Sequence, residues 1–460
     1  MNVHRLSTKL LKDAQSFRQI SEVLLDVSSH LRSVVVLSAI NGMDEYAEEL
    51  IARAVNFNPQ PLIDKFFYRH HQLSLELKLD QEQVKPALED LTLKISDLAF
   101  GIHLTKQCTP RTRDLIHTLI DEAAVLLLHS LLLQKGVSQV HTLDPSANLI
   151  LAKQSQPYPS VDWEQTRLLI KNWADQQRGL ILLGNLLATA PNNQKLSLGK
   201  NSGDYIAGLI AAAVGSPELT VWLDEDGIPA APTDLVTNPK RIRQMSYEES
   251  MEMSYFGSEF LHPYTILPLM KFHIPLTIRN LETPQTISTE IKQVHSGTQN
   301  KITGLTCIKN VSILNVEGGG MVGIPGFAAR VFAALSQAQV NIIMISQASS
   351  EHSICIVIKE EETGRAVRAL EKELESERQT DKIGPIDLIQ PCAIVAVIGD
   401  GMRGFKGLSG KIFSAVGQSD VNILAIAQGS SERNISFTIL AKEAKAALQG
   451  LYHAFFGDEA

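Results

Sequence analysis

Two loops carry residue types that bind phosphate groups or metal ions. In residues 198–208, Gly199, Ser202 and Gly203 directly precede a predicted helix, whose free backbone amides could hold a phosphate. In residues 222–229, Asp224, Asp226 and Gly227 follow a predicted strand, a setting that suits contacts to a nucleotide or its metal ion. Either loop is also explained as an ordinary turn or helix cap, because Asn, Ser, Gly and Asp are common in both.

The elements around these loops predict a doubly covered sheet. Residues 34–37 form a continuous apolar run, which is typical of a strand buried on both faces. Helical patterns occupy residues 9–30 and 43–135, with interruptions near Pro59 and Pro110. Further short strands are expected at 137–144, 179–184, 219–224 and 274–280. This alternation predicts a three-layer α/β/α domain with a mainly parallel sheet, in which ligands collect at the carboxyl ends of the strands.

The last third of the chain contains one unit twice, at an offset of 81 residues. Each copy reads strand, glycine-rich turn, amphipathic helix, strand, serine-rich turn, strand, so one supersecondary unit is repeated. Apolar residues in 326–338 recur at helical spacing and should cover a sheet. The offset relates Met321 to Met402, Phe332 to Phe413, Asn341 to Asn422, Gln347 to Gln428, Glu351 to Glu432 and Ile354 to Ile435.

Composition narrows the classes of function. The 460 residues exceed one ordinary core, so at least two domains are expected. The net charge of −8 argues against a nucleic-acid partner, which needs a basic surface. The four cysteines show no spacing typical of a metal site, and we predict none. The N-terminus has no signal-like apolar core and the apolar runs are too short to span a bilayer, so we expect a cytoplasmic protein.

The duplicated unit resembles the tandem ACT domains of aspartokinases, ferredoxin-like α+β modules that bind amino acids. The matched string in each copy runs from the glycine turn through Val-Asn-Ile to Gln-x-Ser-Ser-Glu. The resemblance implies that the glutamines contact the effector's polar groups; as alternatives, they are polar caps of strand ends, or the ACT pair only dimerises. The implied effector-binding residues are Gly323, Asn341, Ile342, Gln347, Gly404, Asn422, Ile423 and Gln428.

The rest of the chain resembles the amino-acid kinase domain of aspartokinases. The two loops and residues 246–263 carry this resemblance, which points to the kinase plus ACT portion of bifunctional aspartokinase/homoserine dehydrogenases. It implies a kinase domain at 1–292 and ACT domains at 300–378 and 384–460. The polar segment 283–300 is interpreted as the connection between the halves.

The match fails where phosphate and substrate should bind. Aspartokinases begin with Lys-Phe-Gly-Gly-Thr-Ser, but this chain reads RLSTKL from Arg5, so Ser7 and Thr8 replace both glycines. In the aspartate-gripping segment Glu122 is kept, while the cation and the hydroxyl become alanine and valine. In GKNSGD, Lys200 stands for an arginine and Asp204 is kept.

Further departures follow the nucleotide strand. Asp224, Asp226 and Gly227 match the family, whereas a tyrosine, an aspartate and an arginine are lost. Around Leu-His-Pro, an acid and an aromatic residue stand where lysine and arginine are usual. The departing residues are Pro229, Pro232, Asp234, Glu259 and Tyr264.

These losses give a degenerate kinase site beside well-formed effector motifs. Phosphoryl transfer depends on positioning and on charge directed at the transferring group, so we predict a catalytically impaired homologue that senses an amino acid of the threonine or lysine class, as a homodimer or paired with an active aspartokinase. The rival prediction is an active aspartate kinase using ATP and Mg²⁺, with Arg5, Glu122, Lys200 and Asp204 as catalytic residues. A kinase for a different small acid is a third alternative.

Overall fold

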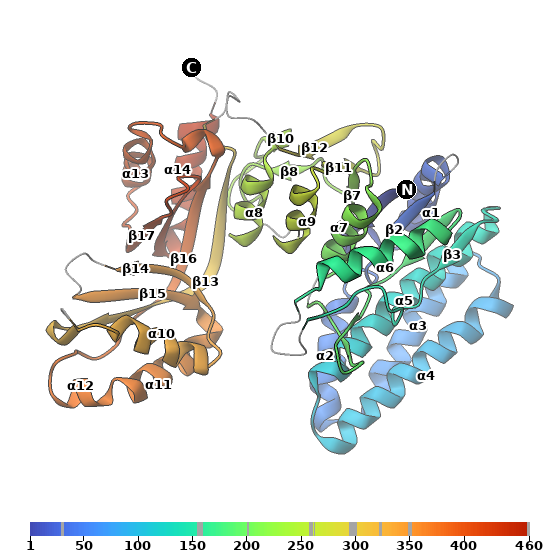
Figure 1. The fold of residues 1–460 in the computed structure, drawn as a ribbon, viewed down its shortest axis with the longest axis horizontal. Coiled ribbons are helices and arrows are strands. Elements are labelled where there is room, and N and C mark those ends of the chain that lie inside the picture. The colour runs from blue at the N-terminus through green and yellow to red at the C-terminus, as the bar shows by residue number, and fades with distance from the viewer. Residues whose placement is uncertain are drawn as a thin grey trace. The chain divides into compact units, whose positions relative to one another are not determined.

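The chain folds into two compact units, each of which is described by itself. The structure, a computed structural model, describes residues 1–28, 32–153, 160–199, 202–256, 261, 263–293, 301–321, 324–347 and 352–457. The first unit comprises Met1–Ile228, Arg243–Tyr247 and Leu261–Gln293, and the second comprises Pro229–Ile242, Glu248–Phe260 and Val294–Ala460. Figure 1 shows the course of the chain through both units.

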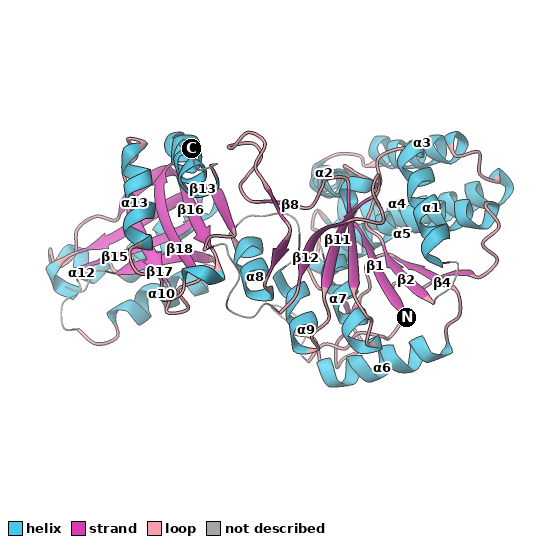
Figure 2. Ribbon diagram, turned by 90° about the horizontal axis from the view of Figure 1, so that it is seen from above, coloured by secondary structure: helices cyan, strands magenta, loops and turns pink. Residues whose placement is uncertain are grey.

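An eight-stranded sheet forms the centre of the first unit, in the order β10-β12-β11-β7-β1-β2-β4-β3 (Figure 2). Every neighbouring pair is parallel except β11 and β12. The α/β fold predicted from the sequence is therefore confirmed, and each strand expected there is present. The strands are β1 (Asn2–Leu6), β2 (Ser33–Val36), β3 (Val140–Thr142), β4 (Leu180–Leu183), β7 (Leu219–Leu223), β10 (Gln244–Met245), β11 (Leu276–Asn280) and β12 (Ile287–Ile291).

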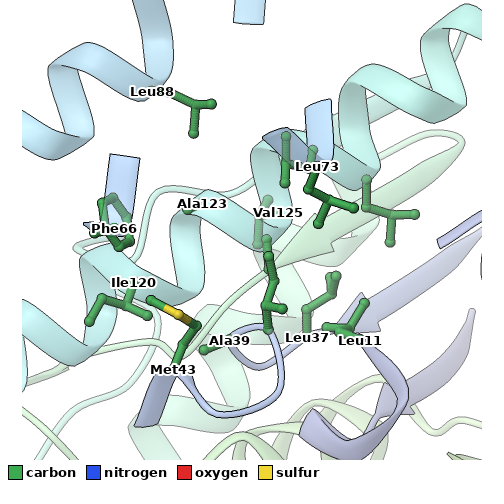
Figure 3. Packing of buried hydrophobic residues seen from close by; sticks show 14 of the residues in the cluster. Leu11, Leu37, Ala39, Met43, Phe66, Leu73, Leu88, Ile120, Ala123 and Val125 are labelled. Carbon is green, nitrogen blue, oxygen red and sulfur yellow. The ribbon is translucent and has the colours of Figure 1, made fainter. Parts of the chain in front are cut away.

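Helices cover this sheet and extend beyond it as a helical layer, in which α3 lies beside α4 and α4 beside α5. The predicted helical region divides at Pro59 and Pro110 as expected, and additionally at Asp80, whose side chain caps α4 by accepting the Glu82 N–H. Figure 3 shows the apolar packing that holds these helices to the sheet. The helices are α1 (Ala14–Ser28), α2 (Met43–Asn56), α3 (Gln60–Glu76), α4 (Gln81–Thr105), α5 (Pro110–Gln134), α6 (Trp163–Gln176), α7 (Ser202–Val214) and α9 (Ile266–Lys271).

One helix, α5, is long and apolar enough to cross a membrane by length and composition alone. The sequence predicted that no apolar run is long enough to span a bilayer. That prediction considered only uninterrupted apolar runs, and α5 is longer than any of them. Its most apolar window is 61% buried inside the protein, where Ile120, Leu127 and Leu131 join the core. Packing against α4 and the sheet accounts for this composition.

Strand β12 corrects the interpretation of residues 283–300 as a connection. Residues 287–291 pair with β11 and, in parallel, with β10. Thr289 and Ser288 are buried, and Thr289 accepts the backbone N–H of Ile228. Residues 294–300 lie outside the described part of the chain. The polar composition misled the interpretation because β12 buries hydroxyl side chains, and that of Thr289 has a hydrogen-bond partner within the fold.

The second unit contains a six-stranded antiparallel sheet in the order β14-β15-β13-β16-β18-β17. The two copies of the repeat share strands. The first half of β13 pairs with the second half of β16, from Gly304 opposite Ile398, and the second half of β13 pairs with the first half of β16, to Asn315 opposite Asp387. The pairing of β13 with β16 therefore joins the strands of the two copies into one sheet. The elements are β13 (Gly304–Glu317), α10 (Phe327–Gln337), β14 (Ile342–Gln347), β15 (Ser353–Lys359), α11 (Thr363–Glu373), α12 (Glu375–Gln379), β16 (Asp387–Ile398), α13 (Leu408–Gln418), β17 (Ala425–Gln428), β18 (Asn434–Leu440) and α14 (Ala444–Phe456).

The repeat extends to individual backbone contacts. A Cβ atom added to Gly318 would collide with the backbone of Lys382, and one added to Gly399 would collide in the same way with Lys301. Both pairs obey the 81-residue offset. These glycines leave room for the backbone segment that leads into the first strand of the other copy.

A further helix of the second unit comes from earlier in the chain. In α8 (Tyr247–Tyr255), Glu249 accepts hydrogen bonds from the Thr303 hydroxyl and, at 2.7 Å, from the Asp400 N–H. The hairpin of β8 (Ile228–Pro229) and β9 (Arg241–Ile242) precedes it. The domain boundaries given from the sequence remain predictions.

Candidate functional site

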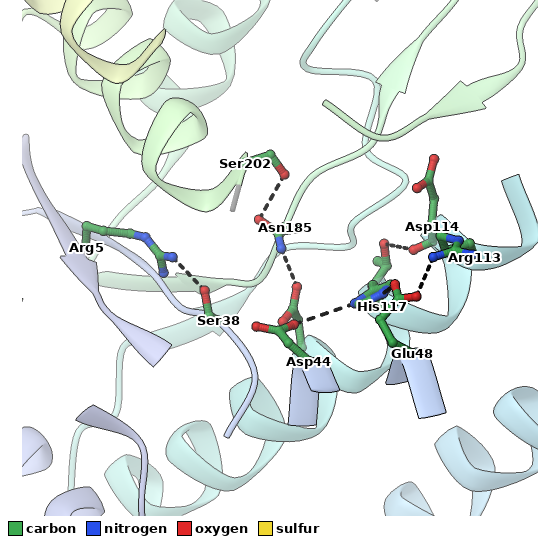
Figure 4. Close-up of polar contacts among 11 residues, drawn as sticks. Arg5, Ser38, Asp44, Glu48, Arg113, Asp114, His117, Asn185 and Ser202 are labelled. Atoms are coloured by element: carbon green, nitrogen blue, oxygen red, sulfur yellow. Dashed lines mark hydrogen bonds and ion pairs between the residues drawn. The ribbon is translucent and has the colours of Figure 1, made fainter. Parts of the chain in front are cut away.

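Arg5 lies at the carboxyl end of β1, and its guanidinium group makes four hydrogen bonds within the protein. Its Nε donates to Asp204 Oδ1 at 2.6 Å. Its Nη2 donates to Ser38 Oγ at 2.6 Å, a contact drawn in Figure 4. Its Nη1 donates to the backbone carbonyls of Leu6 and Val36 at 2.6 and 3.3 Å. The side chain is 3% exposed. Four acceptors thus surround a group that has five N–H donors.

Helix α7 brings Asp204 to Arg5, and Gly203 makes that approach possible. A Cβ atom at Gly203 would lie 2.9 Å from the guanidinium carbon of Arg5 and 3.1 Å from the amide oxygen of Asn185. A larger residue at this position would require the Arg5 and Asn185 side chains to move. The neighbouring Lys200 lies outside the described residues.

The turn after β1 forms a short 3₁₀ helix, η1 (Thr8–Leu10), where an open glycine loop would be needed to cradle a phosphate. The Ser7 hydroxyl accepts the Lys9 N–H at 3.4 Å, and the Ser7 carbonyl accepts the Leu10 N–H at 3.0 Å. The amides of Lys9 and Leu10 are therefore paired inside the turn.

A cavity of about 520 Å³ lies between α2, α5 and the start of α7. On its wall, the i,i+4 pair Asp44 and Glu48 of α2 faces the i,i+4 pair Arg113 and His117 of α5 (Figure 4). His117 contacts Glu48 Oε1 at 2.9 Å and Asp44 Oδ1 at 3.6 Å, and Arg113 pairs with Glu48. The two basic side chains are thus already shared between two carboxylates.

Titration of this cluster follows from its pairing. Burial lowers the pKa of His117, but hydrogen bonds to Asp44 and Glu48 outweigh burial and raise it. Burial alone would raise the pKa of Glu48, but the hydrogen bond to His117 and the charge of Arg113 outweigh burial and lower it. Asp114 lines the same cavity, and burial raises its pKa although it accepts the Ser197 N–H at 3.2 Å.

Asp121 lies beneath the cavity and is 2% exposed. Its Oδ2 accepts the side-chain N–H of Asn185 at 2.6 Å, and the Asn185 oxygen in turn lies 3.3 Å from the Ser202 hydroxyl. Burial, followed by repulsion from Asp44, raises the pKa of Asp121 to about 7. Both the nitrogen and the oxygen of the Asn185 side-chain amide therefore have hydrogen-bond partners within the protein.

The predicted catalytic Glu122 lines a neighbouring cavity of about 700 Å³, with Asp144 and Lys94. Its Oε1 is buried and has no hydrogen-bond partner among the described residues. Burial, and then repulsion from Asp121, raises the pKa of Glu122 to about 8. The structure therefore brings Arg5 and Asp204 together and places Glu122 against a different cavity.

The predicted nucleotide residues lie at the carboxyl end of β7. Lys12 Nζ lies 2.5 Å from Asp224 Oδ2 in a partly exposed ion pair, and Asp226 Oδ1 accepts the side-chain N–H of Asn280 at 2.9 Å. Gly227 has a φ of +79° and packs against Thr289, so only glycine fits there. No cluster of three metal-binding side chains occurs within the described residues.

The family follows from sequence as well as from this geometry. Residues 1–280 match the family model described as amino acid kinase family. The chain belongs to the amino acid kinase family. Residues 314–374 and 395–455 match the ACT domain model, so the amino acid kinase domain is followed by tandem ACT domains, as the resemblance implied.

Relatives of this family member include bifunctional enzymes and aspartokinases. The chain is 30% identical over 466 residues to the bifunctional aspartokinase/homoserine dehydrogenase of Haemophilus influenzae, covering 98% of itself and 54% of that protein. It is 29% identical to an Arabidopsis thaliana chloroplastic bifunctional enzyme, covering 99% of itself and 50% of that protein. The chain thus spans about half the length of these relatives.

The fold agrees with that of a solved aspartokinase. E. coli aspartokinase III in complex with aspartate and ADP superposes with a TM-score of 0.83 at 21% identity, over 99% of this chain and all of that one. The same enzyme in complex with lysine and aspartate gives a TM-score of 0.74. At this identity the likeness shows the fold of the amino acid kinase and ACT domains.

The effector residues predicted in the ACT domains lie at the sheet edges. Gln347 and Gln428 end the edge strands β14 and β17, and both side chains are exposed, as are Asn341 and Asn422. Ile342 and Ile423 are half-buried. Gly323 lies outside the described residues.

The backbone N–H of Gly404, one of the implied effector-binding residues, already has a partner in the protein. It donates to Glu432 Oε2 at 2.6 Å, and Glu432 holds a left-handed φ of +55°. An effector that bound this N–H would therefore have to displace the carboxylate of Glu432.

Most residues of the polar network in Figure 4 were not predicted from the sequence. A usable signal was present for four of its members, because Asp44 with Glu48 and Arg113 with His117 are each spaced i,i+4 on predicted helices. Opposite charges on two helices indicate a contact only when the helices are known to face each other. The missed residues are Ser38, Asp44, Glu48, Arg113, Asp114, His117, Asp121 and Asn185.

Proposed function

We propose that this aspartokinase-family protein is impaired in phosphoryl transfer and acts as a cytoplasmic, amino-acid-sensing regulatory protein of the aspartate pathway, which leads to lysine, threonine and methionine. One observation carries the proposal. Arg5, the cation expected to meet the transferring phosphate, is 3% exposed and donates to four acceptors of the protein.

The reason is electrostatic. Phosphoryl transfer is accelerated by positioning and by cations directed at the charge that develops on the phosphoryl oxygens. To serve a phosphate, Arg5 would have to leave Asp204, Ser38 and two carbonyls, and each abandoned group is buried or nearly so. The paired amides of η1 remove the second source of positive charge.

The ACT domains support the sensing half of the proposal. Exposed amide side chains, Gln347 and Gln428, stand at the two equivalent strand ends, and an amide both donates to and accepts from an amino acid. We propose an effector of the threonine or lysine class. E. coli aspartokinase III has been solved with lysine. An effector that favours one arrangement of a homodimer, or of a pair with an active aspartokinase, would shift its population.

A coupled assay of the purified chain with ATP, Mg²⁺ and L-aspartate tests the impaired transfer. We expect turnover at least about 100-fold below the ordinary range of about 1–1000 s⁻¹ for enzymes. Turnover within that range would overturn the proposal.

Calorimetric titration with threonine, lysine and methionine tests sensing. We expect one of them to bind, and the variant Gln347→Ala or Gln428→Ala to weaken it. Glu49→Gln in α2, far along the chain from the ACT domains, is the control. Absence of binding at millimolar concentration for all three amino acids would contradict the sensing role.

The alternative is an active aspartate kinase. In its favour, Arg5 and Asp204 do meet at the start of α7, and Asp224 and Asp226 stand together after β7. These two carboxylates fit Mg²⁺, which takes one or two protein carboxylates when it accompanies nucleotide phosphates. Bound Mg²⁺-ATP would supply the phosphoryl group and neutralise part of its charge. Under this alternative, Lys12 must release Asp224.

A further inference from the structure

We infer that a third cavity of the first unit, on the face of the sheet opposite to Arg5, binds a zwitterionic α-amino acid with an aliphatic side chain. The cavity has a volume of about 610 Å³ and lies between α1 and the strands β1, β7 and β11. Side chains alternate between the two faces of a strand, so His4 faces this cavity whereas its neighbour Arg5 faces the other side. The described lining contains none of the predicted catalytic, nucleotide-binding or effector-binding residues.

His4 supplies the observation that points to a ligand. It is 5% exposed and lines the cavity. The Trp222 indole N–H donates to His4 Nδ1 at 3.4 Å, and burial, followed by the positive charge of Arg279, lowers the pKa of His4 to about 4. A neutral imidazole whose Nδ1 accepts a hydrogen bond carries its proton on Nε2. That Nε2 is buried and has no hydrogen-bond partner among the described residues.

Arg279 of β11 adds a charged donor to the same wall of the cavity. It lies directly opposite Trp222 in the pairing of β11 with β7. Its Nη1 donates to the Pro284 carbonyl at 3.2 Å, and its Nη2 lies 3.5 Å from Glu218 Oε1, so the described residues use only part of its five N–H donors. A buried donor without a partner destabilises the protein, and a ligand carboxylate has two oxygens that can accept from both His4 and Arg279.

The facing wall of the cavity is one side of α1, and it carries two acids. Glu22 is 70% exposed and lies 3.6 Å from Lys135, and Asp26 accepts the side-chain N–H of Gln285 at 3.2 Å. Exposed contacts of this kind contribute little, so both carboxylates can also accept from an ammonium group. The residues of α1 that line the cavity lie at the helical spacing i, i+3, i+4 and i+7, and they are Gln19, Glu22, Val23 and Asp26.

A zwitterionic amino acid is complementary to both walls. Its carboxylate can accept from His4 Nε2 and Arg279 on the sheet, while its ammonium group donates to the acids of α1. The half-buried Val23 and Leu281 supply apolar surface for an aliphatic side chain. A dicarboxylate would bring a second negative charge to the acids of α1, and a diamine would leave the His4 N–H without an acceptor.

Calorimetric titration of the full chain with L-leucine tests this inference, and we expect leucine to bind. Two analogues keep the aliphatic side chain and lack one charged group each: 4-methylpentanoate has no ammonium group and 3-methylbutylamine has no carboxylate. Each should bind at least about tenfold more weakly than leucine, because each leaves one wall of the cavity without its partner. No binding of leucine at millimolar concentration, or equal binding of leucine and either analogue, would overturn the inference.

Variants of the two walls locate the bound leucine. His4→Phe keeps an aromatic ring and removes the N–H, and the double variant Glu22→Gln with Asp26→Asn removes the acids at exposed positions of α1. Each should weaken leucine binding by at least about tenfold. Glu49→Gln is the control, because Glu49 is an exposed acid of α2 that pairs with Arg53 and is not in the described lining. Thermal unfolding verifies folding, and unchanged leucine affinity in either folded variant contradicts the inference.

The cavity and the ACT domains are tested separately. Leucine is not one of the three amino acids that test the ACT domains, and Gln347→Ala and Gln428→Ala should leave its affinity unchanged. If either of these variants abolishes leucine binding, leucine is held by the ACT domains and the inference about the cavity is wrong. If leucine does not bind while threonine, lysine or methionine does, the sensing role stands and only the assignment of the cavity falls.

Discussion

The kinase site and the ACT repeat use their glycines and polar residues differently. In the ACT domains, Gly318 and Gly399 leave room for the backbone segments that lead into the other copy. The side-chain amides of Gln347 and Gln428 stay exposed at strand ends. In the kinase site, Arg5, Asn185 and His117 direct their donors to acids of the protein. A site whose donors are paired internally must give up those pairs to receive an anion, whereas an exposed edge need not.

This comparison is broken most strongly at Arg5. Arg5→Ala should lower the free energy of unfolding by up to about 3–5 kcal/mol, because it removes a buried cation and leaves the partly buried Asp204, 15% exposed, without it. Urea unfolding measures the loss. Lys12→Ala is the control: its ion pair with Asp224 is about one-third to one-half exposed and should contribute less than about 1 kcal/mol. Equal losses would show that Arg5 is not a structural group.

Substitution of Asp121 should raise the free energy of unfolding, and the size of the gain should depend on pH. In the folded protein burial raises its pKa from the ordinary value of 3.8 to about 7, so the unfolded chain releases this proton first and stability falls as pH rises from about 4 to 7. Asp121→Asn keeps an acceptor for Asn185 and removes the buried charge. It should raise the free energy of unfolding above pH 7 by at most about 4 kcal/mol, and not below pH 4.

Urea unfolding of wild type and Asp121→Asn, at pH 8 and again at pH 5, measures this difference. A gain that is the same at both pH values would mean that ionisation of Asp121 is not its source. Burial, and then repulsion from Asp121, raises the pKa of Glu122, so Asp121→Asn also lowers the pKa of Glu122 and adds to the gain at pH 8.

The close backbone contact between Gly318 and Lys382 is tested by Gly318→Ala. A methyl group there collides with the Lys382 backbone, which cannot rotate away, so we expect a loss of about 1–3 kcal/mol in the free energy of unfolding. Gly399→Ala should lose a similar amount if the repeat is mechanically equivalent. Gly319→Ala is the control, because its Cβ would meet nothing within 4 Å. If alanine at Gly318 and at Gly399 leaves the free energy of unfolding unchanged, these close backbone contacts do not require glycine.

The smallest effect is expected at Glu432. Glu432→Ala frees the Gly404 N–H at a cost below about 1 kcal/mol, because the hydrogen bond is at the surface. If the second ACT domain binds an effector carboxylate at this amide, the variant should bind the effector more tightly in calorimetry. Glu361→Ala, an exposed acid of the first ACT domain, is the control. Weaker binding in Glu432→Ala would assign that carboxylate to effector recognition.

Much of the fold could be predicted from local patterns. The strands of the first sheet, the interruptions at Pro59 and Pro110 and the helix α10 all follow from apolar periodicity and turn residues. Strand β12 could not, because its buried Ser288 and Thr289 look like loop residues until their partners are known. The site was only partly predictable: Arg5 and Asp204 were both singled out, but their direct contact, 199 residues apart in the chain, was not.

By itself, the sequence determined that a unit was built twice and that residues 5–10 contain no glycine, because both are read directly from residue types along the chain. The tertiary structure decided which charges cancel. Asp44, Glu48, Arg113 and His117 each read as ordinary solvent-facing residues of their own helices. Only the packing of α2 against α5 brings them within hydrogen-bonding distance, and electrostatic energy depends on that distance.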